Sequence, residues 1–413
     1  MKKKYVLVGA SSRTRSMFAK PLVNDFDHCA EIVGIFDINP CRSEIIKKEN
    51  NLECKVYTDF DLMISETKPD VGIVTTVDRY HHEYICKLLE AGVDAITEKP
   101  MTIDADKCKQ ILEAEKKTGR NVIVAFNYRF SPYRTAIKQA IVDGYIGDVL
   151  SVNMEYLLNT KHGASYFRRW HSKIENSGSL LVHKSTHHFD LINWLIDDEP
   201  EEVFAYGDRK FYGPTREERG ERCLTCEYKK TCEFYMDLLG NEKLKEMYYD
   251  CENIDGYIRD RCVFSPEIDI YDTMSLNVKY KGGPLLTYSL IAHSPYEGYK
   301  LSISGTNGRI EAEELRDIMD TSVNFNYMNI FNRKGQKIEY TIPKSGGGHG
   351  GGDIRLRTMI FEGGVPDPLK HQAGSYHGST SLMIGASAVE SIKQGKNIKI
   401  KDLISFDKYF NSK

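Results

Sequence analysis

The sequence predicts an α/β domain built on a doubly wound parallel sheet, followed by an α+β domain with a mostly antiparallel open sheet. Up to residue 126, short apolar runs alternate with helical stripes, as in a doubly wound sheet. From residue 127 on, strand-like runs follow one another without long helices between them, which is typical of antiparallel strands. With 413 residues the chain is long enough for two domains, which we place at 1–126 and 127–413.

The first domain is expected to carry buried strands joined by helices. Two helical stripes should end near Gly92 and Gly119, because glycine commonly follows the last turn of a helix. The expected strands are Tyr5–Val8, Glu31–Phe36, Val71–Thr75, Asp94–Thr97 and Asn121–Phe126, and the stripes are Ile85, Leu88 and Leu89, then Cys108, Ile111 and Leu112.

A degenerate glycine loop follows the first strand. The loop runs Gly9-Ala10-Ser11-Ser12-Arg13-Thr14 and keeps only the first of the three glycines of a dinucleotide-binding fingerprint. Ser11 still lets the backbone approach a diphosphate if its side chain turns away, and Arg13 and Arg15 could contact phosphate. A plain helix N-terminus with two solvated arginines is the alternative.

Asp37 closes the second expected strand. A Rossmann fold places at this point the carboxylate that holds the adenosine ribose hydroxyls. The sequence therefore favours NAD over NADP as the cofactor.

Glu98-Lys99-Pro100 follows an expected strand, and open parallel sheets bind ligands beyond the carboxyl ends of their strands. The proline constrains the residue before it. Lys99 should therefore be held in the crevice, where partial desolvation brings its pKa toward neutrality and suits it to proton transfer. A surface Lys-Pro turn is the alternative.

In the second domain, a helix over residues 379–394 should end near Gly395. A further helix is expected to place His183, His187 and Asp190 on one face. Two imidazoles one turn apart can bind a metal or transfer protons near neutral pH, whereas a structural pair capped by Asp190 is the alternative. The expected strands are Ser151–Leu157, Thr273–Tyr280, Leu285–Ile291, Tyr299–Ser304 and Lys337–Ile342.

The ten cysteines are unevenly placed. An insert at about residues 207–272 holds a C-x2-C-x5-C array, which in a cytosolic chain indicates bound metal rather than disulfides. An iron–sulfur cluster and a structural zinc ion both fit, and free thiols are the alternative. The predicted ligands are Cys223, Cys226, Cys232 and Cys262, with Cys251 as the other candidate for the fourth, while Cys29, Cys41, Cys54, Cys86 and Cys108 are expected to be ordinary small residues.

The charge balance is 56 basic against 59 acidic residues, so no bulk field attracts nucleic acid or an anionic membrane. The apolar stretch after the N-terminal lysines is too short for a signal peptide, and no run is long enough to span a bilayer. We expect a cytoplasmic protein with neither nucleic acid nor membrane as partner. An exposed sheet in the second domain predicts a homo-oligomer, either a dimer or a tetramer.

These motifs, in this order, resemble the Gfo/Idh/MocA oxidoreductases, the group of glucose-fructose oxidoreductase and inositol dehydrogenase. The resemblance covers nearly the whole chain except the insert, and it implies NAD(P) at the domain junction with a small carbohydrate or derived acid as substrate. It also implies that Lys99 and His187 are the catalytic acid/base pair and that Glu98 lies near the nicotinamide ribose. Further matches are Thr75, Thr76, His81 and Asn127 on the cofactor side and Arg129 on the substrate side.

Two departures from the family pattern bear on the substrate. His183 replaces the usual aspartate and Lys184 a usually apolar residue, which should favour a substrate with a carboxylate or phosphate. The glycine-rich run 346–353, with His349 as a substrate contact, resembles a segment of NAD-dependent glycosidases. We therefore expect an NAD-dependent oxidoreductase acting on a sugar, polyol or sugar acid. The alternatives are an NAD-recycling glycosidase or lyase with a transient keto-sugar, and a non-catalytic sugar or nucleotide sensor.

Overall fold

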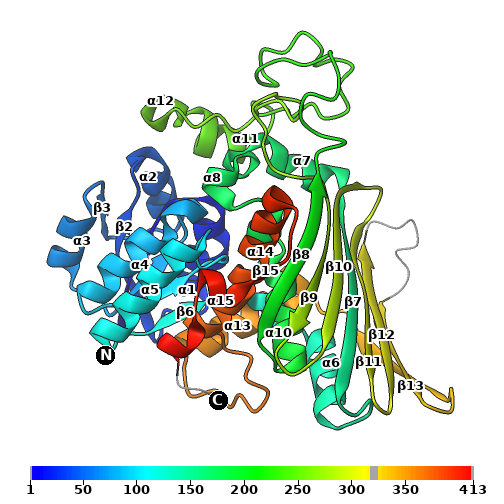
Figure 1. Ribbon diagram of the computed structural model, residues 1–413. Helices are drawn as coiled ribbons and strands as arrows, with labels where there is room; N and C mark the ends of the chain where they lie inside the picture. Colours follow the sequence, from blue (N-terminus) through cyan, green and yellow to red (C-terminus); the bar gives the residue numbers. More distant parts are fainter. Residues whose placement is uncertain (1, 317–323, 411–413) are drawn as a thin grey trace.

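The computed structural model describes residues 2–316 and 324–410. Two sheets lie side by side, one in each half of the chain, and the C-terminal helix α14 (Ser375–Gln394) stands between them (Figure 1). The predicted fold class is confirmed, because the first sheet is parallel and the second is mostly antiparallel.

The first sheet has six strands in the order β3-β2-β1-β4-β5-β6, all parallel, as in a Rossmann fold. The prediction missed only β3, a short run that carries a lysine. The strands are β1 Lys3–Val8, β2 Ala30–Phe36, β3 Lys55–Tyr57, β4 Val71–Val74, β5 Asp94–Thr97 and β6 Val122–Val124, and the helices are α1 Lys20–Asn24, α2 Pro40–Glu49, α3 Phe60–Thr67, α4 His81–Glu90 and α5 Ala105–Thr118.

Helix α5 illustrates how local sequence sets the element boundaries. Asp104 accepts a hydrogen bond from the backbone N–H of Lys107 at 2.9 Å and caps the first turn. Gly119 ends the helix in the left-handed region with φ 66°, as predicted. Gly395 ends α14 in the same way.

The second sheet has nine strands in the order β14-β13-β12-β11-β7-β10-β9-β8-β15. Only β7 and β10 pair in parallel. The missed strands β8, β12, β13 and β15 lie toward the two ends of the sheet and carry many charged or polar residues. The strands are β7 Val149–Asn159, β8 Pro200–Asp208, β9 Thr273–Tyr280, β10 Leu285–Ser294, β11 Glu297–Gly305, β12 Gly308–Arg316, β13 Phe325–Asn332, β14 Lys337–Pro343 and β15 Ile398–Lys399.

One face of this sheet is buried and the other is open to solvent. Buried and exposed residues alternate along β9, because successive side chains of a strand point to opposite faces. Helices α10 (Thr186–Ile196) and α14 pack on each other at the buried side. The remaining helices of this half are α6 Pro132–Val142, α7 Thr160–Arg168, α8 Ile174–Ser177, α9 Leu180–His183, α11 Glu242–Leu244, α12 Glu252–Asp255, α13 Gly352–Phe361 and α15 Ile400–Leu403.

The segment before α14 joins the two sheets. The backbone N–H of Val124 in β6 donates to the carbonyl of Ala373 at 2.9 Å, so this segment borders the first sheet while α14 packs against β8 of the second. The carboxyl ends of the parallel strands consequently face helices α9 and α10.

The insert lies between β8 and β9 and extends from the top of the molecule (Figure 1). Its helices α11 and α12 lie beside the Rossmann domain, where a disulfide joins Cys251 to Cys41 at the start of α2. The expectations that Cys41 is an ordinary residue and that Cys251 is a candidate metal ligand are therefore wrong, because each sulfur is bonded to the other.

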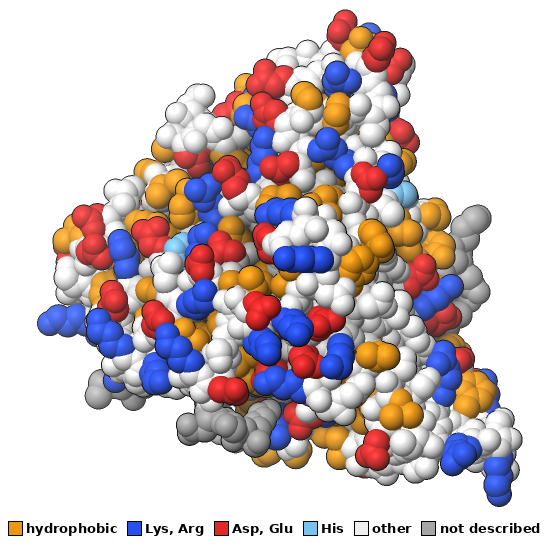
Figure 2. Space-filling model, in the orientation of Figure 1, with side chains coloured by type: hydrophobic (Ala, Val, Ile, Leu, Met, Phe, Trp, Pro, Cys, Tyr) orange, Lys and Arg blue, Asp and Glu red, His pale blue; other side chains and the backbone are white. Residues whose placement is uncertain are grey.

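Basic and acidic side chains are interspersed over the face of the molecule seen in Figure 2. This mixture agrees with the nearly balanced charge of the sequence. Among residues 2–316 and 324–410, no helix has both the length and the apolar character that crossing a membrane requires.

Arg129, which was matched to a substrate contact, lies instead in the interior. Its side chain is fully buried, and its guanidinium donates to both carboxylate oxygens of Asp190 on α10 at 2.7 and 2.5 Å. The structure therefore places Asp190 in a buried ion pair and does not place it as a cap for the histidines. This pair fastens the start of the second domain to α10.

We predict that Arg129→Met lowers the free energy of unfolding by about 3 to 5 kcal/mol, because it leaves the Asp190 carboxylate buried without its partner. Chemical denaturation measures the loss. Arg309→Met, which removes an exposed pair with Glu311, is the matched control and should cost less than about 1 kcal/mol. A loss for Arg129→Met no larger than that of the control would show that the pair does not fasten α10.

Candidate active site

A cavity of about 690 Å³ lies beyond the carboxyl ends of the parallel strands, between the two domains. Its size falls in the range of small-molecule sites. It collects residues from both domains and from the insert. The predicted site residues that line it are Gly9, Ser11, Ser12, Arg13, Asp37, Thr75, Thr76, His81, Glu98, Lys99, His183, Lys184, His187 and His349.

Gly9 makes the turn after β1 at a position that only glycine can occupy. Its φ is +100°, and a Cβ atom there would lie 2.8 Å from the backbone nitrogen of Thr76. Asp37 lies beside this turn, where its carboxylate accepts hydrogen bonds from the backbone N–H of Ala10 at 2.6 Å and of Asn39 at 2.7 Å. The carboxylate is thereby fixed in the cavity wall at the end of β2.

Hydroxyl groups of threonines after β1 and β4 stabilise the glycine loop. Thr14 donates to the carbonyl of Gly9 at 2.7 Å, and its hydroxyl lies 2.7 Å from that of Thr75. The ring of His81 lies 2.8 Å from the carbonyl of Pro100 and 3.2 Å from that of Thr76. Thr14 lies behind the cavity wall, whereas Gly9, Thr75, Thr76 and His81 line the cavity.

Lys99 follows β5 and enters the cavity. Its ammonium donates to the carbonyl of His183 at 2.7 Å, across the domain junction. Burial lowers the pKa of Lys99 to about 8, with Asp78 and Glu98 opposing the shift. Lys99 can therefore exist as a neutral amine or an ammonium ion near neutral pH, as proton transfer requires.

The predicted helix with three aligned side chains is interrupted. Helix α9 ends at His183 and α10 begins at Thr186, so His183 and His187 lie on different helices. The break turns His187 into the cavity, where its ring stacks on Tyr128 with centroids 4.4 Å apart. Burial lowers the pKa of His187 well below its ordinary value, so the imidazole is neutral.

His183 and Lys184 differ in charge, although both were expected to be cationic. His183 lies 2.5 Å from a carboxylate oxygen of Asp78, and burial lowers the pKa of its imidazole well below the ordinary value. Burial also opposes the charge on Lys184, but the phenol oxygens of Tyr128 and Tyr156 raise its pKa. Only Lys184 therefore supplies a positive charge here, which corrects the expected cationic pair.

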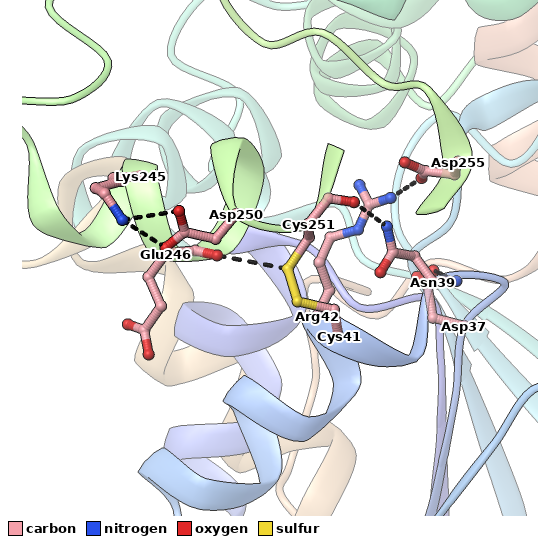
Figure 3. The surroundings of a disulfide bond; sticks show 9 residues. All are labelled: Asp37, Asn39, Cys41, Arg42, Lys245, Glu246, Asp250, Cys251 and Asp255. Carbon is pink, nitrogen blue, oxygen red and sulfur yellow. Dashed lines mark hydrogen bonds and ion pairs between the residues drawn. A yellow bond between two sulfur atoms is a disulfide. The ribbon is translucent and has the colours of Figure 1, made fainter. Parts of the chain in front are cut away.

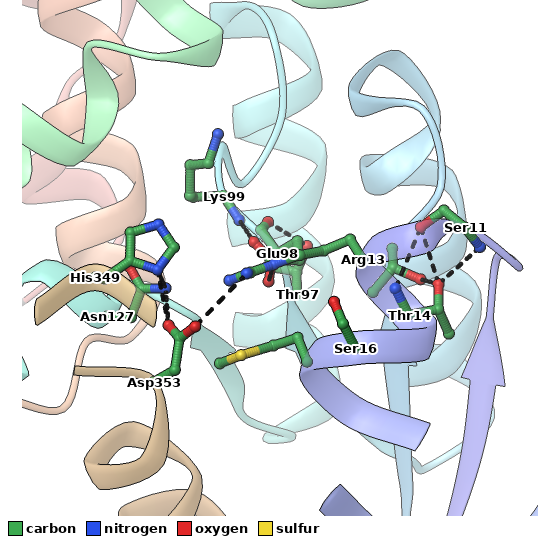
Figure 4. A network of polar contacts seen from close by, with 12 residues as sticks. Ser11, Arg13, Thr14, Ser16, Thr97, Glu98, Lys99, Asn127, His349 and Asp353 are labelled. Carbon is green, nitrogen blue, oxygen red and sulfur yellow. Dashed lines mark hydrogen bonds and ion pairs between the residues drawn. The ribbon is translucent and has the colours of Figure 1, made fainter. Parts of the chain in front are cut away.

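A polar network connects the glycine loop to the glycine-rich run of the second domain (Figure 4). Arg13 donates to Glu98 at 2.5 Å and lies 4.0 Å from Asp353. His349 lies 2.8 Å from Asp353. Asn127 lies behind the cavity wall, donates a hydrogen bond to Asp353 at 2.6 Å and so positions the glycine-rich run 346–353.

The structure leaves Arg15 outside the cavity. Its guanidinium pairs with Glu49 on α2, so Arg15 does not face the glycine loop's ligand side. Arg13 is also engaged, because its Nε donates to Glu98. The geometry therefore gives the predicted phosphate contact of Arg15 no support, whereas Arg13 lines the cavity with its Nε engaged by Glu98.

The four predicted metal ligands line one small cavity of about 20 Å³ in the insert. Cys223 accepts a hydrogen bond from Arg168 at 3.2 Å, and Cys232 accepts one from Arg216 at 3.1 Å. Within residues 2–316 and 324–410, no group of three or more His, Cys, Asp or Glu side chains is arranged to hold a metal ion. The structure thus brings the cysteines together but gives the metal prediction no support.

Sequence reasoning missed the part of the wall that comes from α7, the residues after it and the insert. The basic and aromatic run Tyr166–His171 was a signal that could have indicated a site. No comparable signal marks the insert residues, because tyrosines and a lone aspartate are common on surfaces. The missed residues are His162, Ser165, Tyr166, Arg169, Trp170, His171, Tyr248, Asp255 and Tyr257.

Comparison with known proteins identifies the family of this chain. Residues 3–126 match the oxidoreductase family with an NAD-binding Rossmann fold, and residues 138–400 match the C-terminal alpha/beta domain of the same family. YteT of Bacillus subtilis (strain 168), which is named as an oxidoreductase, is 41% identical over 426 residues, covering 97% of this chain and 98% of YteT.

More distant relatives share parts of the chain or its fold. An inositol 2-dehydrogenase/D-chiro-inositol 3-dehydrogenase of Halalkalibacterium halodurans is 28% identical over 201 residues, covering 48% of this chain and 55% of that protein. The crystal structure of the WlbA dehydrogenase of Bordetella pertussis, in complex with NADH and UDP-GlcNAcA, aligns at 16% identity with a TM-score of 0.66 over 97% of this chain and 99% of that one. The chain belongs to the Gfo/Idh/MocA family of oxidoreductases, with an NAD-binding Rossmann domain and a C-terminal α/β domain.

Proposed function

We propose that this protein is an NAD-dependent oxidoreductase that acts on a CH–OH group of a sugar, polyol or sugar acid. The observation that carries the proposal is that Lys99 and His187, from different domains, line one cavity with Gly9 and Asp37. The relatives named as inositol dehydrogenases support a polyhydroxylated substrate.

The cavity wall fits NAD better than NADP. Asp37 is held by two backbone N–H groups where the adenosine ribose of a dinucleotide would lie. Its carboxylate would repel a 2′-phosphate, and Arg42, the nearby cation, is already paired with Asp255. When bound, the nicotinamide ring supplies the hydride chemistry.

Lys99 and His187 would divide the proton chemistry. The neutral amine of Lys99 can accept the hydroxyl proton during oxidation and return it during reduction. The neutral imidazole of His187, whose Nδ1 has no hydrogen-bond partner among the described residues, is free to bond the same hydroxyl. Glu98 is held by Arg13 and Lys99 by the His183 carbonyl, so both reach the cavity in fixed positions.

Lys184 favours a substrate with an anionic group. Its ammonium lies 3.5 Å from the Tyr128 hydroxyl and 4.9 Å from the Tyr156 ring centre, at the second domain's side of the cavity. A buried ammonium among hydroxyl groups is stabilised by an incoming carboxylate or phosphate. We therefore propose a uronic or other sugar acid over a neutral sugar.

A glycosidase or lyase that recycles its NAD is the second candidate, because His349 lies in the cavity with its ring centre 5.6 Å from that of His187. An oxidised sugar intermediate would then lose its aglycone by elimination and take back the hydride; in a glycosidase water would also add to the carbon that the aglycone left, whereas in a lyase the double bond would remain. Turnover of substrate without added NAD would select this candidate, because a dehydrogenase consumes one NAD for each substrate molecule that it oxidises. Retention of Lys99 and His187 in one cavity argues against a non-catalytic sensor.

We also propose a zinc ion or an iron–sulfur cluster in the insert. Four cysteines line its small cavity, and the chain between β8 and α11, all of which is described, forms no helix or strand that would hold it in shape.

The metal proposal predicts about one zinc ion per chain, or iron with sulfide, in protein prepared without oxygen. Elemental analysis measures both. Cys226→Ser should lower the metal content, and Cys29→Ser, which changes a cysteine outside the insert, should not. If the parent protein contains neither element, the insert cysteines are ordinary thiols.

For catalysis, we predict that Lys99→Ala lowers turnover by roughly 100-fold or more while NAD still binds. In the parent protein, kcat/KM for oxidation should rise with pH through about 8, because only the deprotonated amine of Lys99 accepts a proton. Steady-state kinetics measure both effects. Lys87→Ala on α4, whose lysine lies outside the cavity, is the control; a Lys99→Ala enzyme as active as this control would exclude the catalytic role.

For the substrate, we predict that Lys184→Met weakens binding of uronic acids by roughly tenfold or more and leaves neutral sugars nearly unchanged, since a charged hydrogen bond contributes about 1.5 to 3 kcal/mol. Calorimetry with matched pairs of sugars measures the difference. Lys300→Met on the open face of the second sheet is the control. Equal effects on charged and neutral sugars would contradict the assignment.

A further inference from the structure

The insert contributes to the dinucleotide site, although it begins about 80 residues beyond the Rossmann domain in the sequence. Tyr248 places its hydroxyl 2.6 Å from the Ser12 hydroxyl and accepts a hydrogen bond from the Ser12 backbone N–H at 3.3 Å. Ser12 belongs to the degenerate glycine loop. A residue of the insert therefore contacts the loop that approaches the diphosphate in Rossmann proteins.

Three contacts hold the insert against this site (Figure 3). The disulfide joins Cys251 to Cys41, and Asn39 donates to the carbonyl of Cys251 at 2.9 Å. Arg42 of α2 pairs with Asp255 of α12. Asn39 bonds Asp37 and Arg42 lies near it, so the insert borders the cavity from the Asp37 side toward the glycine loop.

Two arginines beside Tyr248 lack an acidic partner. The Arg259 guanidinium lies 4.7 Å from the centre of the Tyr248 ring, and Arg169 follows α7 in the cavity wall. Throughout the described ranges, neither arginine forms an ion pair with an acidic side chain. The Nε of each and the Nη1 of Arg259 are buried without a hydrogen-bond partner, and the Tyr257 phenol lies beside both guanidinium groups. Each arginine lowers the pKa of the Tyr248 hydroxyl, which places positive charge at this point.

Buried guanidinium nitrogens without partners call for an anion, because desolvated charge is stable only when it is paired. Three acidic groups of the cavity wall are already engaged, since Asp78 bonds His183, Glu98 bonds Arg13 and Asp255 pairs with Arg42. The glycine loop itself keeps only one of three glycines, and the Nε of its Arg13 is engaged by Glu98. Its own means of binding a diphosphate are therefore reduced.

We propose that Arg259 and Arg169, placed with Tyr248 of the insert, bind the diphosphate of the dinucleotide. This inference rests on the proposed use of NAD. The guanidinium fork suits phosphate oxygens. Arg169 lines the cavity, and Arg259 lies behind it over the ring of Tyr248, whose hydroxyl contacts Ser12 of the loop. In this arrangement, the insert replaces contacts that the full set of loop glycines provides elsewhere, and it encloses the cofactor from the second domain.

Calorimetric titration with ADP and with adenosine tests the proposal, because the two probes differ by the diphosphate. Arg259→Gln should weaken ADP binding roughly tenfold or more and leave adenosine binding unchanged. Arg169→Gln changes a residue that follows α7 rather than one in the insert, and it should give the same result. It therefore tests the proposal even if the Arg259→Gln protein does not fold. Lys243→Gln, which removes an exposed charge of the insert, is the matched control and should bind ADP as the parent protein does.

Unchanged ADP affinity in both arginine variants would overturn the proposal. An equal loss for ADP and adenosine would also overturn it, because the arginines would then act only by docking the insert. If the parent protein binds neither ADP nor NADH, the use of NAD itself is wrong, which is a separate result from the failure of the arginine assignment.

Discussion

The site depends on the docking of the two sheets around the carboxyl ends of the parallel strands. Lys99 reaches across this junction to the carbonyl of His183, and the backbone of Val124 bonds that of Ala373 just before α14. Because these contacts join the domains, a lysine from the first and a histidine from the second face the same 690 Å³ of space. Neither domain alone contains the pair.

Burial in this junction gives the basic groups different charges. Desolvation, with neighbouring positive charges acting in the same direction, lowers the pKa of Lys99 to about 8 and lowers the pKa values of His183 and His187 well below the ordinary value. Lys184 keeps its charge because phenol oxygens surround it. One cavity thus offers a group that can exchange a proton, a neutral hydrogen-bonding imidazole and a cation.

The insert changes how the Rossmann domain presents its ligand site. It returns from the second domain to α2, is fixed there by a disulfide across 210 residues of sequence, and places tyrosines beside the glycine loop. On the side of Asp37, the cavity is therefore bordered both by the Rossmann domain and by the insert, which belongs to the second domain.

The sequence by itself determined the local features. Alternating apolar runs and helix-ending glycines such as Gly119 predicted the parallel sheet, because burial and backbone geometry act over a few residues. Gly9, Asp37 and Lys99 were found because each stands at the end of such a strand. The polar strands of the second sheet, such as β12, were missed because one face of the sheet is open and gives no continuous apolar run.

Only the tertiary structure decided the partners of each side chain. Arg129, Asp190 and His183 resemble site residues in the sequence, yet the fold pairs the first two in the interior and binds the third to Asp78. Cys41 and Cys251, and Ser12 and Tyr248, are separated by most of the chain. Such pairs depend on how whole elements pack, and no local pattern of residues encodes that packing.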